Sequence, residues 1–434
     1  MINRQCSMLI LCALLAGCDN SESTTIAEQI GPHPKLDKPS AFLLPPISVP
    51  SKVDWAQGQT PHPAAGLKIE SIAQGLAHPR MVYRLPNNDI LVAESNAPGS
   101  EAVTTPKQLI SGLVKKDSGK GGKGGNRITL LRKDAAGHWQ KYPFIQNLNS
   151  PFGMVLIGQS LYVADADALL VFPYQTGDTA IDATQGKRLA DLPSTINHHW
   201  TKSLTASPDG RHLYVGVGSN SNITENGLEA EYRRAAILEI DRQSGASRIY
   251  ASGLRNPTGV AFDPATQQLW TIVNERDEIG ANLVPDYLTQ VKEGDFYGWP
   301  YSYYGQHVDR RVQPPAPDKV ARAVAPDYAL SSHVAPLGLQ FAQGSHLPGF
   351  GQDGLFISEH GSWNRKPLNG YRVSYVQFSQ GKPVGQPKTV VDGFVSDDQK
   401  TIFGAPVGLT LDNQGALIIA DDVGNQVWRV SAAP

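Results

Sequence analysis

One strand–turn–strand unit recurs six times in this chain. In each copy a turn with Pro or Gly leads into an apolar strand, a Gly, Asn or Asp turn follows, and a second strand ends in small or acidic residues. The copies occupy residues 76–95, 148–165, 202–218, 254–274, 335–359 and 405–421. Units of this kind indicate one small β-sheet per copy, and radial closure of such sheets hides their edges. The sequence therefore predicts an all-β, six-bladed β-propeller.

The spacing and composition argue against other folds. Third strands follow several copies, as at residues 127–132, 236–241 and 426–430, and a β-sandwich would lack this self-similarity. No long stretch has a helical period, which disfavours a doubly wound fold. The 38 basic residues nearly balance the 40 acidic ones, so no global field favours a nucleic-acid partner.

The three cysteines, Cys6, Cys12 and Cys18, all lie in the first eighteen residues. A basic residue, a short apolar run and small residues before Cys18 describe a secretory signal. The LAGC sequence that ends at Cys18 resembles a bacterial lipobox, which implies lipidation of Cys18. An ordinary signal peptide with an incidental cysteine is the alternative. A lipidated Cys18 would leave the mature chain without a free thiol, which excludes thiol catalysis and cysteine-ligated metals.

The chain thus divides into three predicted parts. Residues 1–17 form a lipoprotein signal peptide, residues 18–65 a lipidated Cys with a flexible tether rich in Ser, Thr and Pro, and residues 66–434 the propeller. We expect a location in the cell envelope, lipid-anchored on the periplasmic face of a bacterial membrane. Asp19 resembles a signal that retains lipoproteins in the inner membrane, but the sequence does not decide between the inner and the outer membrane.

Polar residues next to the repeated strands are the candidates for chemistry. His198 and His199 precede the third copy, and a histidine is the usual general base near neutral pH. Arg255 has a rigid fork suited to carboxylate or carbonyl oxygens. Each also has a structural interpretation, as a packed strand entry and a surface ion pair respectively.

Two further segments add to these candidates. The acid-rich loop at 274–280 could hold a hard cation such as calcium through carboxylates and backbone carbonyls, although its spacing is not that of an EF-hand. In the segment at 359–365, Trp363 could stack on a flat ligand, and Asn364 or Arg365 could bind its oxygens. A solvated loop and a Trp packed between blades are the alternatives.

Taken together and in this order, the segments resemble the soluble sugar dehydrogenases that depend on pyrroloquinoline quinone (PQQ), and among them the sorbosone dehydrogenase branch. The resemblance spans roughly residues 66–430. Its motifs are GLRNP at 253–257, NERDEIG at 274–280, PDY at 285–287, YGWP at 297–300 and HGSWNR at 360–365.

The resemblance implies a role for each candidate. His199 would take the hydroxyl proton, with His198 the less favoured choice, and Arg255 would stabilise negative charge on the quinone. The full set of implied cofactor contacts is Lys202, Arg255, Asn256, Trp363, Asn364 and Arg365. The backbone carbonyls of Glu275, Arg276 and Asp277 would hold calcium.

The implied reaction is oxidation of a sugar, aldose or related carbonyl or polyol substrate by hydride transfer to PQQ with calcium. A membrane or soluble electron acceptor would be the redox partner, and the lipid anchor the only membrane contact. One departure concerns the last blade, where Ala405 stands in place of an Arg that relatives use for PQQ carboxylates; Lys202 or Arg365 could supply that charge. A lactonase-like hydrolase and a non-catalytic NHL-like interaction propeller remain as alternatives.

Overall fold

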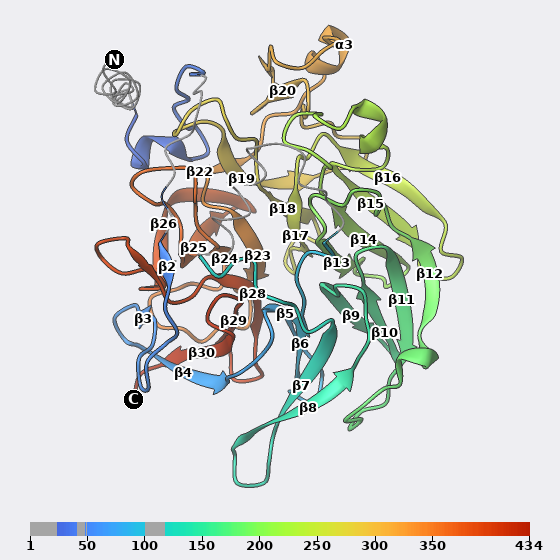
Figure 1. Cartoon of the computed structure of the whole chain (residues 1–434), viewed down its shortest axis with the longest axis vertical. Coiled ribbons are helices and arrows are strands. Elements are labelled where there is room, and N and C mark those ends of the chain that lie inside the picture. The colour runs from blue at the N-terminus through green and yellow to red at the C-terminus, as the bar shows by residue number, and fades with distance from the viewer. Residues whose placement is uncertain (1–23, 41–47, 49, 100–117) are drawn as a thin grey trace, which may run out of the picture.

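A computed structural model describes residues 24–40, 48, 50–99 and 118–434 of the chain. Six antiparallel sheets stand around a common axis as the blades of a propeller (Figure 1). The first three blades are formed by four consecutive strands each. They are β5 (Pro79–Arg84), β6 (Ile90–Glu94), β7 (Arg127–Lys133) and β8 (Trp139–Ile145); β9 (Gly153–Ile157), β10 (Ser160–Ala164), β11 (Ala168–Pro173) and β12 (Lys187–Asp191); and β13 (Lys202–Ala206), β14 (His212–Val217), β15 (Ala236–Asp241) and β16 (Ser247–Ser252).

The other three blades recruit strands from the N-terminal part of the chain. Blade 4 contains β17 (Pro257–Phe262), β18 (Leu269–Val273), β19 (Pro285–Val291), β22 (Tyr328–Ser332) and the added β1 (Ile30–Gly31). Blade 5 contains β23 (Pro336–Phe341), β24 (Gly354–Glu359), β25 (Arg372–Ser379), β26 (Lys382–Asp392) and the added β3 (His62–Pro63). Blade 6 combines β28 (Pro406–Leu411), β29 (Leu417–Asp421) and β30 (Gln426–Ala432) with β4 (Leu67–Ala73), so the two ends of the fold close the ring in one sheet.

Short elements decorate the ring outside the blades. Among them, β2 (Ser51–Lys52) pairs with β27 (Thr401–Ile402), and β20 (Ser302–Tyr303) pairs with β21 (His307–Val308). The described helices are η1 (Ala27–Gln29), η2 (Ala183–Gln185), η3 (Leu228–Glu231) and α3 (Pro317–Val320). No helix in the described ranges is long and apolar enough to cross a membrane.

The innermost strands β5, β9, β13, β17, β23 and β28 contact one another in a closed ring, as their labels show in Figure 1. Four of them begin on a proline, a residue that strands tolerate at their first position. Their backbones approach closely near the axis: a Cβ at Gly338 would strike Val407, and one at Gly408 would strike the backbone of Met81. Glycine is required at both positions because a neighbouring blade occupies the space of a side chain.

We call the end of the axis at which the innermost strands begin the N-mouth. A cluster of Phe152, Trp200, Leu337 and Val407, contributed by blades 2, 3, 5 and 6, packs across the axis near this end. We call these four residues the central plug. The second strand of each blade runs back toward the N-mouth, so the loop between the second and third strands lies at this end. The polar residues that follow the repeated strands therefore gather there.

The predicted six-bladed propeller is confirmed, and each predicted repeat contains the first two strands of one blade. The predicted flexible tether at 18–65 is not what the described part of that segment forms. Residues 24–40 and 50–65 pack on the propeller and add β1 and β3 to its sheets. Cys18 and the rest of the signal region lie outside the described residues.

Candidate functional site at the N-mouth

His199 lies half-buried at the entry to β13. Its Nδ1 is 2.8 Å from the carbonyl oxygen of Ser219 and 3.1 Å from the Ser219 hydroxyl. An Nδ1–H that donates to this carbonyl leaves Nε2 as the proton acceptor of the neutral ring. Burial, together with the charges of Arg255 and His198, holds the pKa of His199 well below its usual value. His199 is therefore neutral near pH 7 and able to accept a proton.

Arg255 is buried beside His199, at the end of the loop that precedes β17. Its guanidinium donates to the Glu275 carbonyl (2.7 Å) and to Asn222 Oδ1 (3.1 Å), and it lies 3.8 Å from Asp277 Oδ2. Burial opposes ionisation of Asp277, but a hydrogen bond from His333 and the charge of Arg255 outweigh it and hold the pKa of Asp277 below its usual range. The site thus keeps a fixed ion pair next to the imidazole.

Asn256 completes this part of the site. A side chain at Gly218 would clash with both the Asn256 amide and His199 Cβ, so the two residues flank the same glycine. The buried Oδ1 of Asn256 has no hydrogen-bond partner. An orphaned buried acceptor next to a candidate base is a feature that a bound ligand with a donor group would satisfy.

The predicted calcium segment does not offer its oxygens freely. The Glu275 carbonyl accepts from Arg255, and the Asp277 carbonyl accepts from Asn222 (3.2 Å) and Arg311 (3.2 Å). No three His, Cys, Asp or Glu side chains of the described residues come together as a metal site. In this arrangement the segment does not fit a calcium ion, because guanidinium groups already occupy two of the three predicted carbonyls.

The side chain of Arg276, to which the sequence assigned no role, holds the loop to its surroundings. Its fully buried guanidinium donates to Glu275 Oε2 (3.0 Å), Asp309 Oδ2 (3.1 Å) and the carbonyls of Pro300 and Ser302. These contacts attach the insertion that contains β20 and β21 to the loop at 274–284. Arg276 thereby fixes the position of its neighbours Glu275 and Asp277.

The other predicted cofactor residues are dispersed around the site. Asn364 donates to Asp277 Oδ1 (2.9 Å), which joins the segment at 359–365 to the Arg255 cluster. Arg365 is buried and donates to the Ala281 carbonyl (3.2 Å), and Trp363 is half-buried, with its carbonyl accepting from Ser48 N (3.1 Å). The ammonium of Lys202 is fully buried and donates to Asn197 Oδ1 (3.0 Å) and the Trp200 carbonyl (2.9 Å), so it supports the turn that presents His199.

A second charged cluster at the N-mouth was not predicted from the sequence. Asp422 accepts from Arg80 Nη1 (2.6 Å) and from His360 Nε2 (2.9 Å), and His78 Nε2 lies 3.6 Å away. Burial opposes ionisation of Asp422, but His360, His78 and Arg80 outweigh it and keep its pKa below the usual range. One carboxylate therefore faces three basic side chains.

Lys120 adds a further cation to this cluster. Its ammonium donates to the Gly361 carbonyl (2.9 Å) and the Tyr371 hydroxyl (3.1 Å), and burial, aided by Arg80 and offset by Asp422, lowers the pKa of Lys120 to about 8. A signal for part of the cluster was present in the repeat. His78 precedes the proline of the first copy, at the position that Asn256 occupies in the fourth.

The central plug joins the two clusters. Trp200 directly follows His199, and the Arg80 guanidinium lies 5.4 Å from the Trp200 ring centroid and 5.9 Å from that of Phe152. The N-mouth therefore combines an aromatic floor, cations on two sides and a neutral imidazole. Such a set suits a flat ligand with several negative charges.

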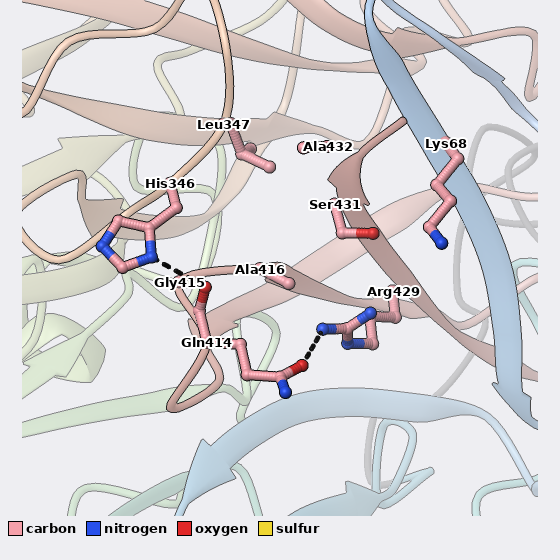
Figure 2. Close-up of a pocket in the computed structure, with 9 residues that line it drawn as sticks. All are labelled: Lys68, His346, Leu347, Gln414, Gly415, Ala416, Arg429, Ser431 and Ala432. Atoms are coloured by element: carbon pink, nitrogen blue, oxygen red, sulfur yellow. Dashed lines mark hydrogen bonds between the residues drawn. The ribbon is translucent and has the colours of Figure 1, made fainter. Parts of the chain in front are cut away.

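Two cavities lie at the opposite end of the propeller. One, of about 260 Å³, is bordered by Lys68, His346, Gln414, Arg429 and Ser431 (Figure 2). Its Arg429 is already paired with Asp412 (2.7 Å) and donates to Gln414 (2.8 Å). The other, of about 380 Å³, is lined by residues of the β5–β6 turn and the end of β7. Neither contains a residue of the two N-mouth clusters.

Comparison with known proteins adds relatives of this fold. An uncharacterised protein of Borreliella burgdorferi is 28% identical over 299 residues, which cover 67% of this chain and 77% of that protein. A pyrroloquinoline quinone-dependent pyranose dehydrogenase of Coprinopsis cinerea is 25% identical over 54% of this chain, but the match spans only 39% of that enzyme.

Solved structures show the same propeller. A Trichoderma reesei protein of Carbohydrate-Active Enzymes Family AA12 superposes with a TM-score of 0.69 at 18% identity, covering 89% of this chain and 99% of that one. The PQQ domain of the Coprinopsis cinerea pyranose dehydrogenase, in its holo form, superposes with a TM-score of 0.68 at 21% identity, covering 89% of this chain and 100% of that domain. The PQQ-bound aldose sugar dehydrogenase of Streptomyces coelicolor superposes with a TM-score of 0.55 at 15% identity, covering 86% of this chain and 100% of that one.

A family model places the chain within this group. The model described as TrAA12-like matches residues 61–294 and 316–433, which include every blade of the propeller. The chain belongs to the TrAA12-like family.

Proposed function

We propose that this protein is a PQQ-dependent oxidoreductase that oxidises a sugar, an aldose or a related carbonyl or polyol. The observation that carries the proposal is the make-up of the N-mouth, where Trp200 forms an aromatic floor between the Arg255 cluster and the Asp422 cluster. The Coprinopsis cinerea relative, named as a PQQ-dependent pyranose dehydrogenase, supports the same chemistry.

The residues of the N-mouth fit the chemical character of PQQ, a flat quinone with three carboxylates. Arg80 and Lys120 supply the positive charge that Ala405 does not provide, and they do so in place of the buried Lys202. Asn256 offers an unpartnered amide oxygen close to His199. We therefore assign Arg255, Asn256, Arg80 and Lys120 to the cofactor site.

The chemistry follows from the positions of the side chains. PQQ, when bound, would supply the group that accepts a hydride from the substrate carbon. His199, with Nδ1 held by Ser219, would accept the hydroxyl proton at Nε2. Arg255, fixed by Glu275 and Asn222, would keep positive charge next to developing negative charge. No step is assigned to calcium, because two of its three predicted carbonyl oxygens already accept from guanidinium groups.

Reconstitution tests the proposal directly. The purified chain is incubated with PQQ, with and without calcium, and the absorption spectrum and dye reduction are measured over aldoses and aldehydes, including sorbosone-type substrates. We expect bound PQQ and substrate-dependent dye reduction. Absence of bound PQQ at micromolar cofactor with calcium present would overturn the proposal.

A pair of variants tests the assignment of Arg80. Arg80→Gln removes a charged donor, and loss of a charge-assisted hydrogen bond of about 1.5–3 kcal/mol weakens PQQ binding about 10- to 100-fold. Arg211→Gln, in the exposed β13–β14 turn at the opposite end, is the matched control and should bind PQQ like the parent. Equal affinities in both variants would remove Arg80 from the site.

We further propose that Cys18 is lipidated and that the protein is held at the periplasmic face of a bacterial membrane. The support is the LAGC sequence that ends at Cys18. Lipoproteins carry several acyl chains, and more than one chain gives stable anchoring. Cys18→Ala should release the protein from membranes, whereas a variant that stays bound after a salt wash would contradict lipidation.

A further inference from the structure

The N-terminal segment enters the fold at the N-mouth end of blade 4. The buried Thr24 accepts a hydrogen bond at its carbonyl from Asn282 Nδ2 (3.1 Å), and Asp37 Oδ2 accepts from the same amide (3.2 Å). Gln29 is fully buried and accepts from Ser331 Oγ (3.1 Å). Asn282 lies in the loop between β18 and β19, the loop that also carries Glu275 and Asp277. The start of the described chain and the candidate site therefore share one loop.

Only six residue steps separate Cys18 from Thr24. A fully extended chain spans at most about 3.6 Å per residue, so this stretch reaches no further than about 22 Å. A blade strand of five to seven residues is itself roughly 17–23 Å long. Cys18 therefore lies within about 22 Å of Thr24, and it could approach the opposite end of the blade only if the whole stretch were almost fully extended along a strand. The short distance favours a lipid near the N-mouth end.

The exposed apolar side chains gather at the same end. Among the described residues, seven large apolar side chains are exposed, and six of them belong to segments that border the N-mouth. These six are Ile26 and Val53 in the N-terminal segment, Leu228 and Tyr232 in the β14–β15 loop, and Val308 and Val324 in the insertion between β19 and β22. The seventh, Ile249, lies in β16 on the rim of blade 3.

Tyr232 is the most exposed of these side chains, with 77% of its surface accessible. It follows η3, and Glu231 of η3 accepts from Asn220 N (2.8 Å) and Ser221 Oγ (2.7 Å). Ser219, in the same loop, binds His199. Tyr232 is thus held on a well-anchored projection next to the site, and tyrosine is a residue favoured at membrane–water interfaces.

We propose that the N-mouth faces the lipid bilayer, with Tyr232 at the membrane interface. This orientation rests on the proposed lipidation of Cys18 and is independent of PQQ. The partner is the bilayer to which the anchor attaches, and the opposite end, with its polar turns and paired Arg429, faces away from it. Substrate and electron acceptor would then reach the site along the membrane surface.

Site-specific fluorescence tests the orientation in the full-length lipidated protein. Lipidation of Cys18 removes the last native thiol of the mature chain, so a single introduced cysteine can be labelled with bimane. Tyr232→Cys places the label at the N-mouth. Gln159→Cys places it on an exposed residue of the β9–β10 turn at the opposite end and is the matched control. Both proteins are reconstituted in phosphatidylcholine vesicles with and without brominated acyl chains.

We expect the label at 232 to lose fluorescence in brominated vesicles and the label at 159 to keep it. Equal quenching at the two positions, or stronger quenching at 159, would overturn the orientation. Flotation of the vesicles is measured first. A chain that does not float with them, and whose Cys18 reacts with bimane, would show that lipidation itself is wrong.

Discussion

His199 and Arg255 act on each other through charge. The guanidinium of Arg255 makes protonation of the buried imidazole less favourable, and the Ser219 carbonyl fixes which ring nitrogen carries the proton. A base of this kind stays unprotonated at acidities where an exposed histidine, with a pKa of about 6.5, takes up a proton. The structure therefore links the choice of base to a pH dependence that can be measured.

We predict that His199→Ala lowers turnover about 100- to 10,000-fold, the usual contribution of a general base, while PQQ still binds through other loops. His198→Ala, its neighbour, should lower turnover far less. In the parent, the pH at which kcat falls on acidification should lie below the ordinary pKa range of histidine. Arg255→Gln should move this pH upward, because a cation beside the imidazole is lost. Small and equal losses in the two histidine variants would show that the pair is structural.

At the scale of elements, the N-terminal segment is held to the propeller by specific contacts. The ring centroid of Trp55 lies 5.3 Å from that of Phe403 and 5.4 Å from that of Trp428. The indole N–H of Trp55 donates to Asp421 Oδ2 (2.9 Å) at the end of β29. Burial raises the pKa of Asp421 to about 6, although hydrogen bonds from Trp428 and Trp55 oppose that rise. Because this folded-state pKa is raised, Asp421 favours folding most at low pH and loses that contribution as the pH rises to about 6.

The Trp55 hydrogen bond stabilises the charged form of Asp421, which sets the expected effect of removing it. Trp55→Phe keeps an aromatic ring and should lower the free energy of unfolding by about 1.5–3 kcal/mol well above pH 6 and by less well below it. Urea unfolding of both proteins, well above and well below pH 6, measures how much unfolding free energy the variant loses at each pH. Trp139→Phe, at a partly buried indole whose N–H donates to no described residue, is the control, and a pH-independent loss in Trp55→Phe would contradict the role of Asp421.

Elements differ in how far the sequence predicts them. The first two strands of each blade are long, apolar and bounded by turn residues, so periodicity alone places them. The added strands β1 and β3 contain two residues each and lie in a segment rich in Ser, Thr and Pro. A two-residue strand has no period to detect, and the contacts that stabilise it come from the far edge of a blade. The same composition would describe a tether.

At the scale of the whole molecule, the site shows a similar division. His199, Arg255, Asn256 and Asp277 stand next to repeated strands and could be proposed from motifs. The Asp422 cluster could not, because Arg80 and Asp422 are 342 residues apart and meet only when the ring closes. Lys120 reaches the cluster from an insertion between β6 and β7 that no repeat defines. The Asp422 cluster of the N-mouth therefore forms only when the ring closes.

Ring closure depends on β4, which comes from before the first repeat and supplies the fourth strand of blade 6. It pairs with β30 from Ala73 to Leu67, and its Leu67, Ile72 and Ala73 are buried in two different apolar clusters. A chain that begins at residue 66 keeps β4, whereas one that begins at residue 75 leaves β30 as an open edge. Burial of a Leu or Ile side chain contributes about 1.5–3 kcal/mol, so the shorter chain loses at least roughly 3–6 kcal/mol more.

We predict that the chain beginning at residue 66 unfolds cooperatively in urea and binds PQQ, with reduced stability because β1, β3 and Trp55 are absent. The chain beginning at residue 75 should lose cooperative unfolding and, with it, PQQ binding, because Arg80 of blade 1 and Asp422 of blade 6 are no longer held together across the closing seam. Circular dichroism during urea titration and equilibrium PQQ binding measure both effects. Cooperative unfolding with intact PQQ binding in the shorter chain would show that closure through β4 does not assemble the N-mouth.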